Sequence, residues 1–389
     1  MIKLTSYSIK KVYLILTIFA VNFLFGQSYD EMVSQILENN RELKALRSMN
    51  RVEILRAKNE LLPENPALKH EFKENDNYEI GITQSFRFPT FYYHQYKNLQ
   101  LTKAQQKAVF EAARLKILEE AGGHLYHLAF LERQISIQKN RLDKASRLLD
   151  YFEKMMTEGE STQLAVNQAK IHKINYKNQL TDLLVQKNDV ESQLKVLNGG
   201  SELKINLEIA DQFSAIIDTT NLRSDYLQKN PALKLESLNH AIAMRNTKIA
   251  KQSWLPDFRI GVHREKETGP LFHYGISLPL WKTKNKGHRA KAARNAHQAN
   301  QLQKQHSVTA KINRLLEQYR LLKLQYDTNL ELKQSLNSEE LLTKSLEVEE
   351  ISAIEYFTEL EKLYNFEDEF RKTRLGLQIV IVQLTSFRK

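Results

Sequence analysis

The side chains best suited to chemistry in this sequence are histidines and carboxylates, and their spacing does not match a catalytic site. His124 and His127 are three residues apart on an expected helix, a spacing that can hold a metal ion. We expect no carboxylate to complete a ligand set with them, and the chain has no cysteine, so we expect no metal site. There is also no HExxH motif, nucleophile elbow, phosphate-binding loop or convincing carboxylate pair. We therefore expect neither an enzyme nor a bound cofactor.

A second set of polar side chains recurs at every other position of two segments, residues 61–88 and 254–281. Apolar side chains fill the intervening positions, and a period of two is typical of β-strands. Each segment predicts a hairpin of two strands, each about ten residues long, which is the length of a tilted transmembrane strand. The polar positions that we single out are Lys69, Glu71, Glu79, Arg87, Arg259, His263, Glu265 and His273. The alternation alone fits both membrane-crossing strands and soluble hairpins packed on a helical core.

The two hairpins occupy matching places in a duplicated chain. Pro63 and Pro256 are 193 residues apart, and Gly81 and Gly275 are 194 residues apart. Each hairpin is preceded by a helical segment rich in alanine and lysine and is followed by a much longer helical one. A period kept in register over this distance indicates an internal duplication. We place the two repeats at about residues 29–200 and 221–389.

Long helices must carry these hairpins. Residues 102–157 contain no proline and only the glycine pair Gly122–Gly123, which predicts a helix of roughly 80 Å that packs as a coiled coil. A tight turn over residues 158–161 and a return helix over 162–197 follow. The other expected elements are helices over 29–62 and 221–253, an aromatic connector over 89–98, a linker over 201–220, a basic connector over 282–294, a long helix over 290–346, a turn over 347–352 and a last helix to about residue 387.

The beginning of the sequence has the pattern of a secretory signal. Three lysines precede a short apolar run over residues 12–25, and Gly26 offers a small residue for cleavage. This predicts a signal peptide over residues 1–26 and a single domain over residues 27–389; a signal anchor is the alternative. Removal of the signal leaves 54 basic and 46 acidic side chains, a net charge of +8. The charges are interspersed along helices, so we expect solvated helix faces and no nucleic-acid partner.

Four strands are too few to close a barrel. Unpaired strand edges are not tolerated in a bilayer, because each orphan backbone group costs several kcal/mol there. A symmetric homotrimer would contribute twelve strands, an even number within the known range of membrane barrels. The polar faces would then line a wet lumen, and outer-membrane lipid would contact the apolar faces.

The whole arrangement resembles the TolC-like outer-membrane efflux protein family. The resemblance rests on the order helix, Leu-Pro hairpin, long helix, turn and return helix, which occurs twice behind a signal peptide. It also rests on Asn-Pro-Ala-Leu at residues 230–233, on Gly-Ile in each second strand, and on Ala165 and Ala169 in the first return helix. It implies a mainly α fold with transmembrane β-strands, in which three chains share a twelve-stranded barrel above a periplasmic tunnel of helical hairpins.

The resemblance also implies a function and partners. Members are passive conduits of tripartite efflux systems, located in the cell outer membrane with most of the chain in the periplasm. They export small molecules or metal ions and dock to a periplasmic adaptor, the membrane fusion protein, and an inner-membrane pump. The substrate here is left open between metal ions and drugs or other small molecules.

Candidate site residues follow from the same resemblance. The pattern Ser-x-x-acid after the second tip falls on Ser352 and Glu355, so Glu355 takes the position of a charged ring that attracts cations. The second acidic position falls on Thr358, with Glu359 beside it, which departs from the family pattern. The expected adaptor contacts at the two helical tips are Gly159, Glu160, Ser161, Glu350, Ile351 and Ser352. For each tip the alternative is a plain helical-hairpin turn, and for Glu355 it is an ordinary solvated helix residue.

One other class of protein fits long helical hairpins. A soluble periplasmic coiled-coil adaptor of an export system has such a hairpin, together with flanking β-rich domains. This chain has two long hairpins and few β segments. The sequence therefore favours the conduit and keeps the adaptor as the alternative.

Overall fold

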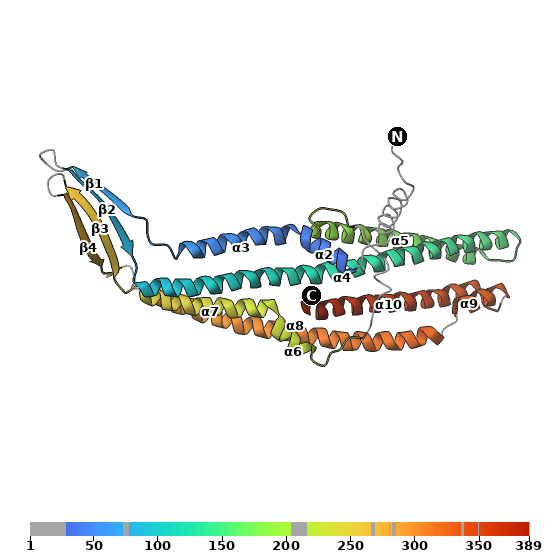
Figure 1. Ribbon diagram of the computed structural model, residues 1–389. Coiled ribbons are helices and arrows are strands. Elements are labelled where there is room, and N and C mark those ends of the chain that lie inside the picture. The colour runs from blue at the N-terminus through green and yellow to red at the C-terminus, as the bar shows by residue number, and fades with distance from the viewer. Residues whose placement is uncertain are drawn as a thin grey trace, which may run out of the picture. The chain divides into compact units, whose positions relative to one another are not determined.

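The computed structural model describes residues 29–72, 78–203, 216–265, 269–279, 281, 285–335, 338–348 and 350–388 (Figure 1). The expected signal peptide, most of the expected linker and most of both hairpin turns lie outside these residues. The chain divides into two compact units, and each repeat contributes to both. Unit 1 contains Met1–Arg41, Lys116–Thr220 and Arg314–Lys389, and unit 2 contains Glu42–Leu115 and Asn221–Asn313.

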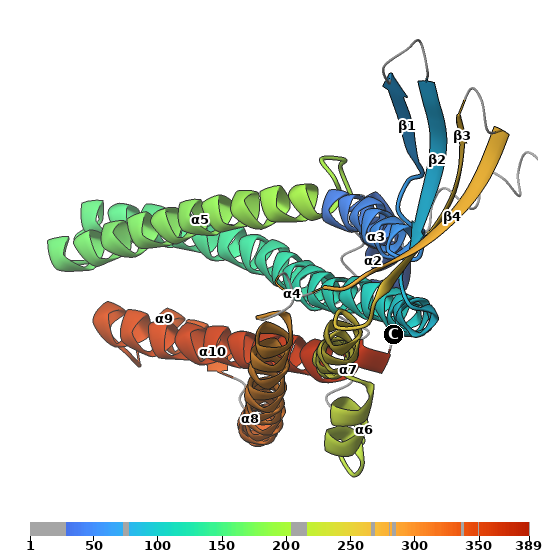
Figure 2. The same ribbon diagram turned by 90° about the vertical axis from the view of Figure 1, so that its left-hand side faces the viewer.

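Unit 2 contains a single four-stranded antiparallel sheet, and Figure 2 shows its strands side by side. The strands are β1 (Ala67–Phe72), β2 (Tyr78–Phe86), β3 (Asp257–Glu265) and β4 (Gly269–Ser277). Their order in the sheet is β1-β2-β3-β4, so the two predicted hairpins are confirmed and are joined by pairing of β2 with β3. This central pairing brings the two repeats together.

Helices of unit 2 come from both repeats. They are α3 (Arg41–Asn59), the first part of α4 (Pro89–Thr157), α6 (Leu222–Lys229), α7 (Pro231–Gln252) and the first part of α8 (Lys286–Ser335). Side-chain amides link them. Asn50 on α3 donates to the carbonyl oxygen of Gln106 on α4 at 3.0 Å, and Gln105 on α4 donates to Asn239 on α7 at 2.7 Å.

The expected aromatic connector over residues 89–98 is wrong, because these residues form the first turns of α4. Proline at the first position of a helix lacks only an N–H that would have no helical partner, and its fixed φ suits the helix. Pro89 therefore starts α4 instead of separating it from β2. The basic connector is also shorter than expected, since α8 begins at Lys286.

Unit 1 is built from helices in both repeats: α2 (Tyr29–Asn39), the second part of α4, α5 (Gln163–Leu197), the second part of α8, α9 (Ser338–Glu347), α10 (Ala353–Thr385) and the short 3-10 helix η2 (Ser386–Arg388). Aromatic and aliphatic side chains from α4, α5 and α10 form one buried cluster, which includes Phe152, Val166, Tyr176, Phe357 and Tyr364. These side chains form a core that α4, α5 and α10 share.

Several predicted helices are divided. An asparagine marks the break in each repeat: Asn40 separates α2 from α3, and Asn230 separates α6 from α7. The Asn230 Oδ1 atom caps α7 by accepting from the N–H groups of Ala232 and Leu233 at 3.0 and 3.4 Å, as the helix N-terminus requires. The predicted helix over residues 290–346 is likewise two helices, α8 and α9. Among the residues that the structure describes, no helix is long and apolar enough to cross a membrane.

Candidate functional site

One face of the sheet is apolar, and most of its large side chains are exposed. Tyr274 is 91% exposed, Phe272 85% and Phe72 81%. Seven further large apolar side chains on this face are exposed, and Phe258 and Val262 are half-buried; the exposed ones are Leu68, Tyr78, Ile80, Ile82, Phe86, Ile260 and Ile276. A soluble protein rarely leaves a contiguous apolar surface of this kind uncovered. The sheet therefore carries a surface suited to an apolar environment.

The opposite face of the sheet carries the predicted polar residues. Lys69 pairs with Glu71 at 2.5 Å and with Glu79 at 3.5 Å, so one cation serves two carboxylates on neighbouring strands. Glu265 lies opposite Glu79, and Arg259 lies opposite Ser85. The strand register thus gathers the expected charged side chains of β1, β2 and β3 on one surface.

Two histidines of the same set meet on this polar face. The Nδ1 atoms of His263 on β3 and His273 on β4 are 3.3 Å apart, and the Nε2 atom of His273 is 3.1 Å from the Thr83 hydroxyl on β2. The sequence had placed both histidines on polar positions, and the structure brings them into contact. The register of the hairpin explains the contact, because His263 lies opposite Leu271, which is two residues from His273 on the same face of β4.

Arg87 is not part of the polar strand face. β2 ends at Phe86, and the Arg87 guanidinium lies 4.4 Å from the ring centroid of Phe91 in the first turn of α4. Its inclusion among the strand residues is therefore wrong. Arg87 instead makes a cation–π contact at the junction between strand and helix.

The first helical tip is a tight turn between α4 and α5. Gly159 has a φ of +79°, a conformation that glycine adopts without strain. The N–H of Glu160 donates to the carbonyl oxygen of Met155 at 2.9 Å, and Thr162 caps α5 through Ala165. Ser161 completes the turn, so the predicted tip and its return helix are confirmed as structural elements.

The second tip joins α9 to α10. The N–H of Glu350 donates to the carbonyl oxygen of Ser345 at 2.9 Å, and the Ser345 hydroxyl donates to the Glu350 carboxylate at 3.2 Å. The side chain of Ile351 packs against the buried cluster of unit 1. Of the predicted contact residues of this tip, Glu350 is thus exposed, whereas Ile351 is partly buried against the cluster.

Glu355 and Ser352 form a capping box at the start of α10. One carboxylate oxygen of Glu355 accepts from both the backbone N–H and the hydroxyl of Ser352 at 2.8 Å, and the N–H of Glu355 donates back to that hydroxyl at 3.3 Å. Hydrogen bonds from Ser352 lower the pKa of Glu355. The candidate gate carboxylate is therefore also part of the capping box of its helix, in which Ser352 is the N-cap.

The other two gate candidates, Thr358 and Glu359, make their side-chain contacts within α10. The Thr358 hydroxyl donates to the carbonyl oxygen of Ile354 at 2.8 Å, and Glu359 pairs with Lys362 at 2.6 Å. Both are exposed. Neither contact reaches another helix, so these side chains lie on the surface of α10.

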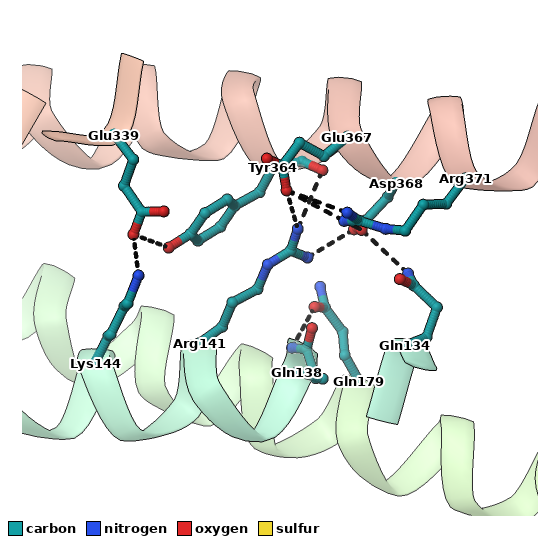
Figure 3. A network of polar contacts seen from close by, with 10 residues as sticks. All are labelled: Gln134, Gln138, Arg141, Lys144, Gln179, Glu339, Tyr364, Glu367, Asp368 and Arg371. Carbon is teal, nitrogen blue, oxygen red and sulfur yellow. Dashed lines mark hydrogen bonds and ion pairs between the residues drawn. The ribbon is translucent and has the colours of Figure 1, made fainter. Parts of the chain in front are cut away.

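A polar network that the sequence did not indicate links α4, α5, α9 and α10 (Figure 3). The buried Arg141 donates to Asp368 at 2.8 Å and lies 4.0 Å from the ring centroid of Tyr364. Arg371 and Gln134 also donate to Asp368, at 2.6 and 3.1 Å. Sequence separations of more than 220 residues between Arg141 and α10 explain why no local pattern revealed it.

The network sets the charge states of its members. Burial alone would raise the pKa of the Asp368 carboxyl, but the hydrogen bonds from Arg141, Arg371 and Gln134 outweigh it and lower the pKa. Burial, together with the charge of Glu339, raises the pKa of Tyr364. The Tyr364 hydroxyl donates to Glu339 at 3.0 Å, and Lys144 forms an ion pair with the same carboxylate. Asp368 is thus an ion and Tyr364 a neutral donor at neutral pH.

The helical histidine pair of the sequence gains no further ligand. His124 and His127 are half-buried on α4, and burial lowers the pKa of both. The described part of the chain holds no group of three or more His, Cys, Asp or Glu side chains arranged to bind a metal ion.

Comparisons with known proteins give the fold a precedent. No protein-family model and no curated protein matches the sequence. Among solved structures, the Campylobacter jejuni CmeC outer membrane channel matches with a TM-score of 0.75 and 16% identity, over 92% of this chain and 84% of that one. A crystal structure of CusC, from work on its folding and transmembrane channel formation, matches with a TM-score of 0.76 and 14% identity, over 92% of this chain and 90% of that one.

The open Neisseria gonorrhoeae MtrE outer membrane channel also matches, with a TM-score of 0.72 and 14% identity, over 92% of this chain and 87% of that one. Nearly the whole of each chain is aligned. The chain therefore has the fold of CusC and of the CmeC and MtrE outer membrane channels, and the mainly helical chain with four strands that the resemblance to the TolC-like family implies is confirmed.

Proposed function

We propose that this chain is the outer-membrane channel of an efflux system and exports small molecules or metal ions from the periplasm or a pump to the exterior. The observation that carries the proposal is the sidedness of the sheet, whose exposed face is apolar while charged and imidazole side chains gather on the other. Strands of a membrane barrel that encloses water alternate in this way. The chain would then lie in the outer membrane, with most of its residues in the periplasm.

The sheet requires partners to function in a bilayer. Among the four described strands, β1 and β4 are the outer ones, and their free edges would leave backbone groups unpaired in lipid. In a cyclic homotrimer, β4 of each protomer pairs with β1 of the next and closes twelve strands. The polar side chains of all three sheets then face one lumen.

The two helical tips are the proposed contacts with a periplasmic adaptor, which in turn contacts an inner-membrane pump. Both tips expose polar residues, namely Glu160 at the first and Glu350 at the second, over the buried cluster of unit 1. The adaptor interpretation of the chain itself is not favoured, because the fold similarity to channels covers more than nine-tenths of it.

We place the gate at the start of α10. Glu355 is an ionised carboxylate in the first turn after the tip, and three copies around an axis would attract cations and repel anions. Thr358 and Glu359 follow on the same helix and would contribute to the entrance.

Two measurements test this function directly: the mass of the protein in detergent and its location among cell membranes. We expect light scattering of the full chain to give a trimer, and we expect cell fractionation to recover it with outer membranes after a high-salt wash. Planar bilayers should then show conducting channels. A salt-soluble monomer would contradict the proposal, because the exposed apolar sheet face would then need another explanation.

A further inference from the structure

The histidine pair on the polar face of the sheet has the geometry of a metal chelate. We propose that His263 and His273 bind one divalent transition-metal ion through their Nδ1 atoms, which are 3.3 Å apart. Imidazole nitrogens lie about 2.0–2.1 Å from a bound zinc ion, so two of them at a tetrahedral angle are about 3.3 Å apart. The spacing of the two Nδ1 atoms therefore matches that of two imidazole ligands on one ion.

Thr83 on β2 orients one of the two rings. The Nε2 atom of His273 is 3.1 Å from the Thr83 hydroxyl on β2. When Nε2 carries the proton and donates to this oxygen, the lone pair on Nδ1 is available to a metal. Metal-binding histidines are generally held by such a hydrogen bond from the other ring nitrogen. Thr83 thus acts as a positioning residue.

Glycines make room for both rings. Gly261 lies opposite His273, and a β-carbon there would collide with the ring atoms Cε1 and Nε2. Gly81 lies opposite His263, and a β-carbon there would come within 3.0 Å of the His263 Cβ. Each histidine therefore faces a glycine on the adjacent strand, so that the two imidazoles can lie close together and half-buried on the sheet.

The ligand set selects the class of ion. Imidazole favours Cu²⁺, Ni²⁺ and Zn²⁺, with Cu²⁺ bound most tightly, whereas Mg²⁺ and Ca²⁺ prefer oxygen ligands. The described part of the chain adds no third protein ligand, so water completes the coordination and the ion exchanges readily. Binding of this strength allows an ion to leave as well as enter.

This site goes beyond the proposed channel function, since binding depends only on the sheet. Its location in the lumen rests on that function. In a trimer there would be three such pairs at one level of the barrel.

Titration of the full chain tests the proposal. The protein is purified in detergent without a polyhistidine tag and titrated with Cu²⁺, Ni²⁺ and Zn²⁺ in a calorimeter. We expect one ion to bind per chain, and we expect Cu²⁺ to bind more tightly than Ni²⁺ or Zn²⁺. His263→Asn and His273→Asn should each abolish this binding, and Thr83→Val should weaken it by about 10–100-fold.

Two variants serve as matched controls. His70→Asn removes a histidine from the apolar face of the same sheet, and His124→Asn removes one from the pair on α4. Both should bind as the unmodified protein does. Electron paramagnetic resonance of the unmodified protein with Cu²⁺ should show coupling to two nitrogens, a result that does not depend on how any variant folds.

The proposal is overturned if the folded protein binds no ion, if binding survives in both His263→Asn and His273→Asn, or if it is lost in His124→Asn instead. The mass and conductance of the same preparation are measured in parallel. A conducting trimer without metal binding rejects only the metal site, whereas a metal-binding monomer rejects only the channel.

Discussion

The buried guanidinium of Arg141 on α4 donates a 2.8 Å hydrogen bond to Oδ2 of Asp368 on α10. Removal of one partner from a buried ion pair leaves the other charge poorly compensated and typically costs 3–5 kcal/mol. Arg371 and Gln134 still donate to Asp368, so we expect Arg141→Met to cost about 3 kcal/mol, at the lower end of that range. Hydrogen exchange of the α10 amides near residue 368 measures the loss.

Arg147→Met is the matched control, because Arg147 lies on the same helix in an exposed ion pair with Asp143. Exposed pairs of this kind contribute about 0.3–0.5 kcal/mol. Equal effects of the two substitutions would show that the Arg141 pair adds nothing beyond a surface contact.

Acid should weaken unit 1 through Asp368. The pKa of this carboxyl is lowered in the folded chain, so its stabilising effect is fully present above the unfolded value, about 3.9, and is lost as the pH falls through the lower folded value. We expect the difference in unfolding free energy between the unmodified protein and Asp368→Asn to be constant near neutral pH and to shrink below about pH 4. Urea denaturation followed by circular dichroism at a series of pH values measures it. A difference that grows in acid would reverse the assigned sign.

Local patterns in the sequence predicted the elements well, and long-range pairing explains most of what they missed. Alternation located all four strands, and the glycine in the turn at residue 159 located the first tip. Arg141 and Asp368 are 227 residues apart, and no local spacing reports such a contact. Pro89 misled the prediction because proline either ends a helix or begins one, and here it begins α4.

The candidate site residues were likewise predictable from local patterns, but their contacts were not. Strand alternation placed His263 and His273 on one face, but their contact depends on the register across the hairpin and on two facing glycines. Glu355 was expected as a gate residue by resemblance, and its capping role appears only with the position at which α10 begins. Residue type and period predict faces, whereas register and helix ends decide which side chains meet.

The adjacent glycines of α4 should respond oppositely to alanine. A β-carbon on Gly122 would meet the Tyr29 hydroxyl at 2.5 Å and a Val382 methyl at 2.7 Å, whereas one on Gly123 would meet nothing within 4 Å. We expect Gly122→Ala to destabilise unit 1 by about 1–3 kcal/mol through overpacking. Gly123→Ala should stabilise it by up to about 1 kcal/mol through helix propensity. Thermal unfolding of the two variants side by side tests this, and a stabilising Gly122→Ala would contradict the close packing.

Three substitutions separate the two roles of Glu355. Glu355→Gln removes the charge but keeps a side chain that completes a capping box, and Ser352→Ala removes the cap but keeps the charge. If the carboxylate acts as a cation-attracting ring, Glu355→Gln should lower cation selectivity in planar bilayers while Ser352→Ala leaves it nearly unchanged. Ser352→Ala should instead cost about 1 kcal/mol of helix stability. Glu355→Ala should show both effects. If Glu355→Gln leaves the cation selectivity unchanged, Glu355 serves only in the capping box and not as a charged ring.

The sidedness of the sheet can be tested on one strand. Tyr274 and Ser277 lie on β4, with Tyr274 on the exposed apolar face and Ser277 on the polar face. A lysine on a lipid-facing position near the middle of a membrane strand costs about 2–4 kcal/mol, and lumen positions tolerate it. We expect Tyr274→Lys to reduce the amount of folded trimer recovered from outer membranes and Ser277→Lys to leave it near the level of the unmodified protein. If both lysines are tolerated equally, lipid does not contact the apolar face, and that face must be covered by protein instead.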